Sequence, residues 1–235
     1  DEADYIAAAI QKKVKEERAS YKDCAVLYRT NAQSRMFEER FVSTNIPYKV
    51  IGGVNFYARR EIKDLLAYLR TIENGRDDLA VRRIINVPKR GIGLTSINRV
   101  QEYALQKETG FYEALLAADL IPGIGRALSK LESFVALIEH FKEEAGRLTP
   151  LALLTDIIET LDCENYLEEI DMEDAESRIE NIEELKSKLA SYEESCEEAG
   201  EQPTLSGFLE EVALVADIDN LDEESDYVVL MTLHS

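Results

Sequence analysis

A short loop ahead of an expected helix combines several residues suited to binding phosphate. Gly91 and Gly93 flank an apolar residue, Lys89 and Arg90 precede them, and Thr95 follows in the first helical turn. Glycines permit a tight turn and a close backbone approach to a ligand, while free amides at a helix start attract anions. Lysine, arginine and threonine would add hydrogen-bond donors. We therefore expect this loop to bind a phosphate-rich ligand.

A second G-x-G sequence follows in more acidic surroundings, at residues 120–126 (LIPGIGR). Two glycines around one apolar residue are weak evidence by themselves, because the same pattern occurs in ordinary turns between helices. We interpret this copy as a structural turn.

The second candidate site lies near the N-terminus, where an apolar strand is followed by Arg29, Thr30 and Asn31. Open α/β sheets bind ligands beyond the carboxyl ends of their strands, and an arginine with an amide could hold a phosphate and touch a base there. A capped helix start with a solvated arginine explains the same residues. Both interpretations stay open at this point.

Charge is distributed unevenly along the 235 residues, whose net charge is −20. Residues 1–100 hold 19 Lys and Arg against 13 Asp and Glu, so the remaining 135 hold 8 of the 27 cations and 34 of the 47 acids. An acidic surface repels nucleic acid. A nucleic-acid surface, if present, should therefore lie within the first hundred residues, and the acidic remainder could instead receive protein partners.

Metal, redox and independent ATPase chemistry are not expected. Cys24, Cys163 and Cys196 form no C-x-x-C pair, and only two histidines occur, which argues against a zinc site. No G-x-x-x-x-G-K-[ST] phosphate loop is present. The opening letters D-E-A-D suit the acidic first turn of a helix. We expect no catalytic residues, no metal and no cofactor in this chain.

The expected elements give a mainly α fold with a small parallel α/β sheet. Strands are predicted at 24–28, 48–51 and 227–233, with a helix from about Tyr5 to Arg18 and another beginning near Asn31. Residues from about Phe56 to Asp222 are predicted to be helical, with apolar stripes at helical spacing. The four stripes are Ile62, Leu65, Leu66, Leu69 and Ile72; Leu131, Phe134, Ile138 and Phe141; Leu151, Leu154, Ile158 and Leu161; and Ile179, Ile182, Leu185 and Leu189.

Four ordered segments resemble motifs of the UvrD/PcrA/Rep type of superfamily 1 DNA helicases. They are residues 25–35 (AVLYRTNAQSR), 45–70 (NIPYKVIGGVNFYARREIKDLLAYLR), 83–100 (RIINVPKRGIGLTSINRV) and 228–235 (VVLMTLHS). The resemblance implies a partial RecA-like motor domain, called 2A, at residues 1–55 and 223–235. Residues 56–222 would form an all-helical insertion, called 2B, within that incomplete domain.

The resemblance also implies roles for individual residues. Arg29 and Asn31, with Thr232 and His234, match positions that contact single-stranded DNA in the family. The loop containing Lys89, Arg90, Gly91, Gly93 and Thr95 would contact duplex DNA. A third group, Arg59, Glu61, Lys63 and Asp64, matches a helix at the junction of 2A and 2B, where we favour a structural role that includes an ion pair of Arg60 with Asp64.

The sequence departs from the family pattern because the phosphate loop, the acidic magnesium site and the last arginine motif are missing. We therefore expect a piece of a helicase, inactive towards ATP alone, whose complete form uses ATP and magnesium. The alternative is an acidic helical module for protein interaction or autoinhibition. No apolar stretch approaches the roughly 20 residues of a membrane helix, so a cytoplasmic location is expected.

Overall fold

The computed structural model describes residues 2–16, 19–29, 33–51, 56–172, 174–218 and 226–232. The chain divides into two compact units. The first, here called the sheet unit, comprises Asp1–Arg59 and Glu210–Ser235; the second, the helical unit, comprises Arg60–Leu209. The sequence placed the limits of the helical insertion at 56 and 222.

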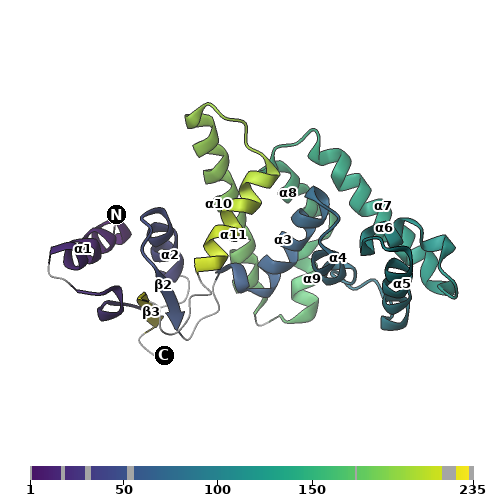
Figure 1. Cartoon of the computed structure of the whole chain (residues 1–235), viewed down its shortest axis with the longest axis horizontal. Helices are drawn as coiled ribbons and strands as arrows, with labels where there is room; N and C mark the ends of the chain where they lie inside the picture. Colours follow the sequence, from purple (N-terminus) through teal and green to yellow (C-terminus); the bar gives the residue numbers. More distant parts are fainter. Residues whose placement is uncertain are drawn as a thin grey trace. The chain divides into compact units, whose positions relative to one another are not determined.

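Three parallel strands form the sheet of this unit: β1 (Ala25–Tyr28), β2 (Tyr48–Ile51) and β3 (Val228–Thr232). Figure 1 labels β2 and β3. The strand order is β1-β3-β2. Leu230 of β3 is in register with Val26 on one side and Val50 on the other. A strand from near the end of the sequence thus completes the sheet begun by the first fifty residues, and the prediction of a small parallel sheet is confirmed.

Two helices supply the rest of the sheet unit, α1 (Glu2–Glu16) and α2 (Ser34–Ser43), with short 3-10 turns at Tyr21–Asp23 and Phe56–Ala58. Their apolar faces pack with the inward side chains of the strands in one core cluster, which includes Ala7, Phe41 and Tyr48. Glu2 and Asp4 lie in the first turn of α1, which agrees with the prediction of an acidic helix start, and Asp1 lies outside the described residues. Asp4 pairs with Arg40 at 2.7 Å.

The helical unit contains α3 to α10 and the first turns of α11 (Figure 1). Their bounds are α3 (Arg60–Glu73), α4 (Asp78–Ile84), α5 (Leu94–Lys107), α6 (Phe111–Leu116), α7 (Leu128–Ala145), α8 (Pro150–Thr160), α9 (Cys163–Ile170), α10 (Ala175–Ala199) and α11 (Leu205–Ile218), with 3-10 turns at Ala118–Leu120 and Gly125–Ala127. The mainly helical fold class is therefore confirmed.

The predicted apolar stripes match the core in α3, α7 and most of α10, whereas in the third stripe only Leu154 is deeply buried. Every residue of the α3 and α7 stripes is buried. In α8 the deeply buried residues are Leu153, Leu154 and Ile157, while Leu151 and Ile158 are only half-buried. The apolar face of α8 is broad and the predicted stripe lies along one edge of it, so spacing alone did not identify the inward residues.

Two helix starts, those of α8 and α11, have threonine caps. The Thr149 hydroxyl accepts a hydrogen bond from the Ala152 amide at 3.3 Å, and Pro150 occupies the first helical position. Thr204 likewise accepts from the Gly207 amide at 3.1 Å. A threonine oxygen satisfies an amide that the helix itself cannot pair. Among the described residues, no helix is both long enough and apolar enough to cross a membrane.

Candidate nucleic-acid interface

The loop between α4 and α5 presents glycine backbone on the surface around a buried anchor. Residues Lys89–Gly93, here called the G-I-G loop, precede α5 directly. Ile92 is only 4% exposed, whereas Gly91 and Gly93 on either side of it are exposed. Gly91 has φ +66°, a left-handed conformation that favours glycine. The apolar side chain therefore fixes the loop to the core while the neighbouring backbone faces outward.

The start of α5 follows without a side-chain cap, since its N-cap is Gly93. The Gly93 carbonyl accepts from the amides of Ser96 and Ile97 at 2.9 and 3.2 Å. Leu94 and Thr95 in the first turn are exposed. An exposed helix start with glycine at its cap can bring backbone amides close to an anion.

Lys89 and Arg90 were both predicted as phosphate-binding cations, but their side chains lie in different environments. Lys89 is exposed. Arg90 is half-buried, and its guanidinium carbon lies 5.2 Å from the ring centre of Phe134. Its Nη1 donates to the carbonyls of Ile84 at 2.9 Å and Val87 at 3.0 Å, with longer contacts to the next carbonyls along the chain. Arg90 therefore holds the backbone that leads into the loop.

Two residues to which the sequence analysis assigned no role also shape the loop. The Asn86 side chain pairs with the backbone of Ile92 twice: Nδ2 donates to the carbonyl at 2.7 Å, and the Ile92 amide donates to Oδ1 at 3.0 Å. Lys130 of α7 donates to the Gly91 carbonyl at 2.8 Å. No local pattern indicates the second contact, because 39 positions separate its partners.

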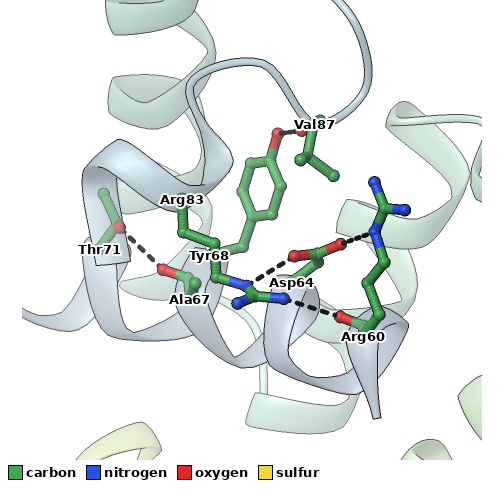
Figure 2. Close-up of polar contacts among 7 residues, drawn as sticks. All are labelled: Arg60, Asp64, Ala67, Tyr68, Thr71, Arg83 and Val87. Carbon is green, nitrogen blue, oxygen red and sulfur yellow. Dashed lines mark hydrogen bonds and ion pairs between the residues drawn. The ribbon is translucent and has the colours of Figure 1, made fainter. Parts of the chain in front are cut away.

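Polar contacts join α3 to α4 and to the segment that precedes the G-I-G loop (Figure 2). Asp64 accepts from Nε of Arg83 at 2.6 Å, and the predicted ion pair with Arg60 is present at 4.0 Å. The Tyr68 hydroxyl donates to the Val87 carbonyl and accepts from Nη2 of Arg90 at 2.6 Å. Burial raises the pKa of Tyr68 to about 12, so the phenol stays protonated and able to donate.

The second G-x-G sequence lies close to α5. Gly123 and Gly125 have φ +73° and +48°, and a 3-10 turn follows before α7. The carbonyl of Gly123 accepts a hydrogen bond from Arg99 of α5. Both G-x-G segments therefore have a carbonyl bound by a cation from another helix, Arg99 for this one and Lys130 for the G-I-G loop.

The carboxyl ends of β1 and β3 lie side by side in the sheet unit. Tyr28 is in register with Thr232, so Arg29, which follows β1, is placed at the same edge as the end of β3. Arg29 is exposed, and its amide donates to Oε1 of Gln33 at 2.9 Å. Asn31 and His234, the other two predicted contacts, lie outside the described residues.

The residues matched to the helix at the domain junction, Arg59, Glu61 and Lys63, lie in different environments. Glu61 is buried and accepts from Nδ2 of Asn181 at 2.6 Å, which joins α3 to α10. Within the sheet unit, the guanidinium of Arg59 lies 5.4 Å from the ring centre of Phe56. Lys63 is exposed. Across the described part of the chain, no three His, Cys, Asp or Glu side chains gather as possible metal ligands.

Comparison with known proteins shows the family to which this chain is similar. The family model described as the UvrD-like helicase C-terminal domain matches residues 1–235. The ATP-dependent DNA helicase PcrA of Staphylococcus aureus is 42% identical over 235 residues, and PcrA of Staphylococcus epidermidis is 40% identical over the same length. Both alignments cover 100% of this chain and 32% of the relative. The chain thus spans about a third of the length of these relatives.

Proposed function

Because the chain belongs to the family of UvrD-like helicase C-terminal domains, we propose that it is the non-catalytic portion of an ATP-dependent DNA helicase. The sheet unit would be part of motor domain 2A, and the helical unit would be the inserted domain 2B. ATP and magnesium would be bound by the remainder of a complete helicase. The relatives named ATP-dependent DNA helicase support this assignment.

The G-I-G loop carries the proposal for duplex DNA. Exposed Lys89, the outward backbone of Gly91 and Gly93 and the uncapped start of α5 with Thr95 offer donors to phosphate from one surface. Contacts to phosphates position a protein on DNA but carry no base code. The loop would therefore hold a duplex without sequence preference, through few phosphates and with low affinity.

A single strand would be contacted at the carboxyl edge of the sheet. Exposed Arg29 follows β1, and Thr232 ends the neighbouring strand β3. Parallel sheets bind ligands at this edge because successive loops meet there. Asn31 and His234 belong to the same proposal through their sequence positions.

The experiment is a salt titration of duplex binding, followed by fluorescence anisotropy at low ionic strength. We expect a dissociation constant in or above the ~10⁻⁴ to 10⁻⁶ M range of non-specific binding. The affinity should decrease as the salt concentration rises. Lys89→Ala should reduce the slope of log affinity against log salt by about one phosphate contact. A matched control is Lys107→Ala. This substitution removes an exposed lysine at the C-terminal end of α5, about 20 Å from the start of that helix.

The acidic half of the chain favours a second candidate function, a module that receives protein partners. Residues 101–235 hold 8 Lys and Arg against 34 Asp and Glu. Such a surface repels DNA. This candidate predicts no duplex binding to titrate at any salt concentration, whereas binding that depends on Lys89 supports the DNA-contacting function.

A further inference from the structure

The G-I-G loop is held from inside by side chains that bind its backbone. We propose that Arg90 and Asn86 are positioning residues: they keep the loop in the shape that presents Lys89 and the glycine backbone to phosphate, and they contact no DNA themselves. This inference rests on the proposed duplex-binding function, but it assigns Arg90 a role opposite to that of a phosphate donor.

Both amino groups of the Arg90 guanidinium, Nη1 and Nη2, donate to acceptors within the protein. Its Nη1 lies within 3.4 Å of four carbonyls, those of Ile84, Ile85, Val87 and Pro88. The first two lie at the end of α4, where a helix leaves carbonyls without internal partners. A cation at a helix C-terminus also interacts favourably with the helix dipole. Turning outward to a phosphate would expose these carbonyls and break the contact with Phe134.

The tyrosine beneath the loop extends the same arrangement. Nη2 of Arg90 donates to the Tyr68 hydroxyl at 2.6 Å, and that hydroxyl donates to the Val87 carbonyl. The guanidinium and the phenol therefore hold the Val87 carbonyl together. A lysine in place of Arg90 would keep the charge but would lack the planar fork that reaches several acceptors at once.

Asn86 supplies the second restraint, and it carries no charge that could attract DNA. Its amide group satisfies both the carbonyl and the amide of Ile92, the residue between the two glycines. Glycine-rich backbone has many accessible conformations, and ordering it upon binding would reduce affinity. A loop already ordered before DNA arrives avoids that loss.

The test uses the 235-residue chain with Arg90→Lys and Asn86→Ala, compared with Lys89→Ala. Amide hydrogen exchange at Ile92 reports the order of the loop without DNA, and anisotropy at low salt reports duplex affinity. Both positioning variants should accelerate exchange at Ile92 and weaken duplex binding by about fivefold, as expected for loss of a hydrogen bond. Lys89→Ala should weaken binding while leaving the exchange rate at Ile92 unchanged.

A double substitution sharpens the distinction. If Arg90 acts through the loop that carries Lys89, the losses from Arg90→Lys and Lys89→Ala should be less than additive. Independent phosphate contacts would give additive losses, and a charge-only role would let Arg90→Lys bind like the unmodified chain; either result overturns the inference. Should Arg90→Lys fail to fold, by circular dichroism, uncharged Asn86→Ala carries the test.

The two proposals fail in different ways. Accelerated exchange at Ile92 in Asn86→Ala, together with unchanged duplex affinity, would overturn the positioning role and leave the duplex function standing. An unmodified chain that binds no duplex at low salt would overturn the proposed function, and the positioning role for DNA with it.

Discussion

Asp64 on α3 accepts a hydrogen bond from Nε of Arg83 on α4 at 2.6 Å (Figure 2). The same arginine donates through Nη2 to the carbonyl of Arg60 at 3.3 Å. The Asp64 side chain is only 12% exposed, and its desolvation raises the pKa of the carboxyl group although Arg83 opposes the shift. The pair therefore fastens α4, the helix from which the G-I-G loop departs, to α3.

We predict that Arg83→Ala destabilises the chain more than Arg60→Ala does. The first substitution leaves a largely buried carboxylate without its closest donor, which should cost about 1–3 kcal/mol. The second removes an exposed partner at 4.0 Å, and helix pairs of this kind contribute only ~0.3–0.5 kcal/mol. Urea denaturation at neutral pH measures both. Equal losses would show that Arg83 contributes no more than a surface charge.

Glu38 on α2 provides a prediction about pH. Burial raises the pKa of Glu38 above its ordinary 4.5, and its Oε1 lacks a hydrogen-bond partner among the described residues. The folded state therefore binds more protons than the unfolded state between the two pKa values. Stability should fall as pH rises through that window, and the penalty should persist at higher pH.

Glu38→Gln removes this ionisation and keeps the size of the side chain. We predict that the variant gains stability over the unmodified chain at pH 8 and shows little difference at pH 4, where both side chains are neutral. Thermal melts at the two pH values measure the change. The opposite result would be a glutamine variant that is less stable than the unmodified chain at pH 8 but not at pH 4. It would mean that attraction to nearby arginines stabilises the Glu38 carboxylate more than burial destabilises it.

Local pattern was sufficient for much of the fold. Strand β2 has its predicted bounds, and β1 and β3 differ from their predicted ranges by a residue or two at the ends. Such segments combine apolar runs with turn residues on both sides, which makes their structure a local property. In α8 the pattern identified Leu154 but chose Leu151 and Ile158 over the more deeply buried Leu153 and Ile157, because all of them lie on one broad apolar face.

The site was predictable in its backbone but not in its side-chain contacts. The turn at Gly91 and the helix start at Leu94 follow from the positions of glycine. Sequence alone treated Arg90 as a surface donor, because whether a cation faces solvent or the end of a helix depends on packing against distant residues such as Tyr68 and Phe134. The contact of Lys130 with Gly91 was not predictable either, because 39 positions separate the two residues in the sequence.

We predict that this chain does not hydrolyse ATP, with or without DNA. No G-x-x-x-x-G-K-[ST] segment is present to surround the phosphates and present a lysine to them. A coupled assay for released ADP or phosphate provides the measurement. A rate that persists through repurification and disappears when residues of this chain are substituted would contradict the prediction, whereas a contaminating ATPase would not respond to those substitutions.

The helical unit is predicted to fold cooperatively without the sheet unit. Its core includes Leu66, Phe134, Leu154 and Leu185 from four different helices, all of them buried. A chain of residues 60–209 should show helical circular dichroism and one sigmoidal melting transition. The sequence-based limits 56–222 provide the matched comparison. Helical signal with a broad, non-cooperative melt in both chains would show that the core is incomplete without residues of the sheet unit.

The two glycines of the G-I-G loop allow backbone strain to be separated from contact with DNA. Gly91 has φ +66°, and a Cβ there would lie 2.9 Å from Nζ of Lys130. Gly93 has φ −72° and open space where a Cβ would be. Gly91→Ala should therefore destabilise the chain by about 1–2 kcal/mol, the cost of a left-handed conformation. Gly93→Ala should cost less, roughly 0.5–1 kcal/mol, because its φ suits alanine but alanine is a poorer N-cap than glycine.

Their effects on duplex binding should follow a different rule. If phosphate approaches the backbone at the start of α5, a methyl group on Gly93 would hold it away, so Gly93→Ala should weaken duplex affinity although the fold is unchanged. Gly91→Ala should weaken affinity as well, through the altered turn. Anisotropy at low salt and thermal melts on the same samples measure both properties. A native fold together with unchanged duplex affinity in Gly93→Ala would place the phosphate contact away from this helix start.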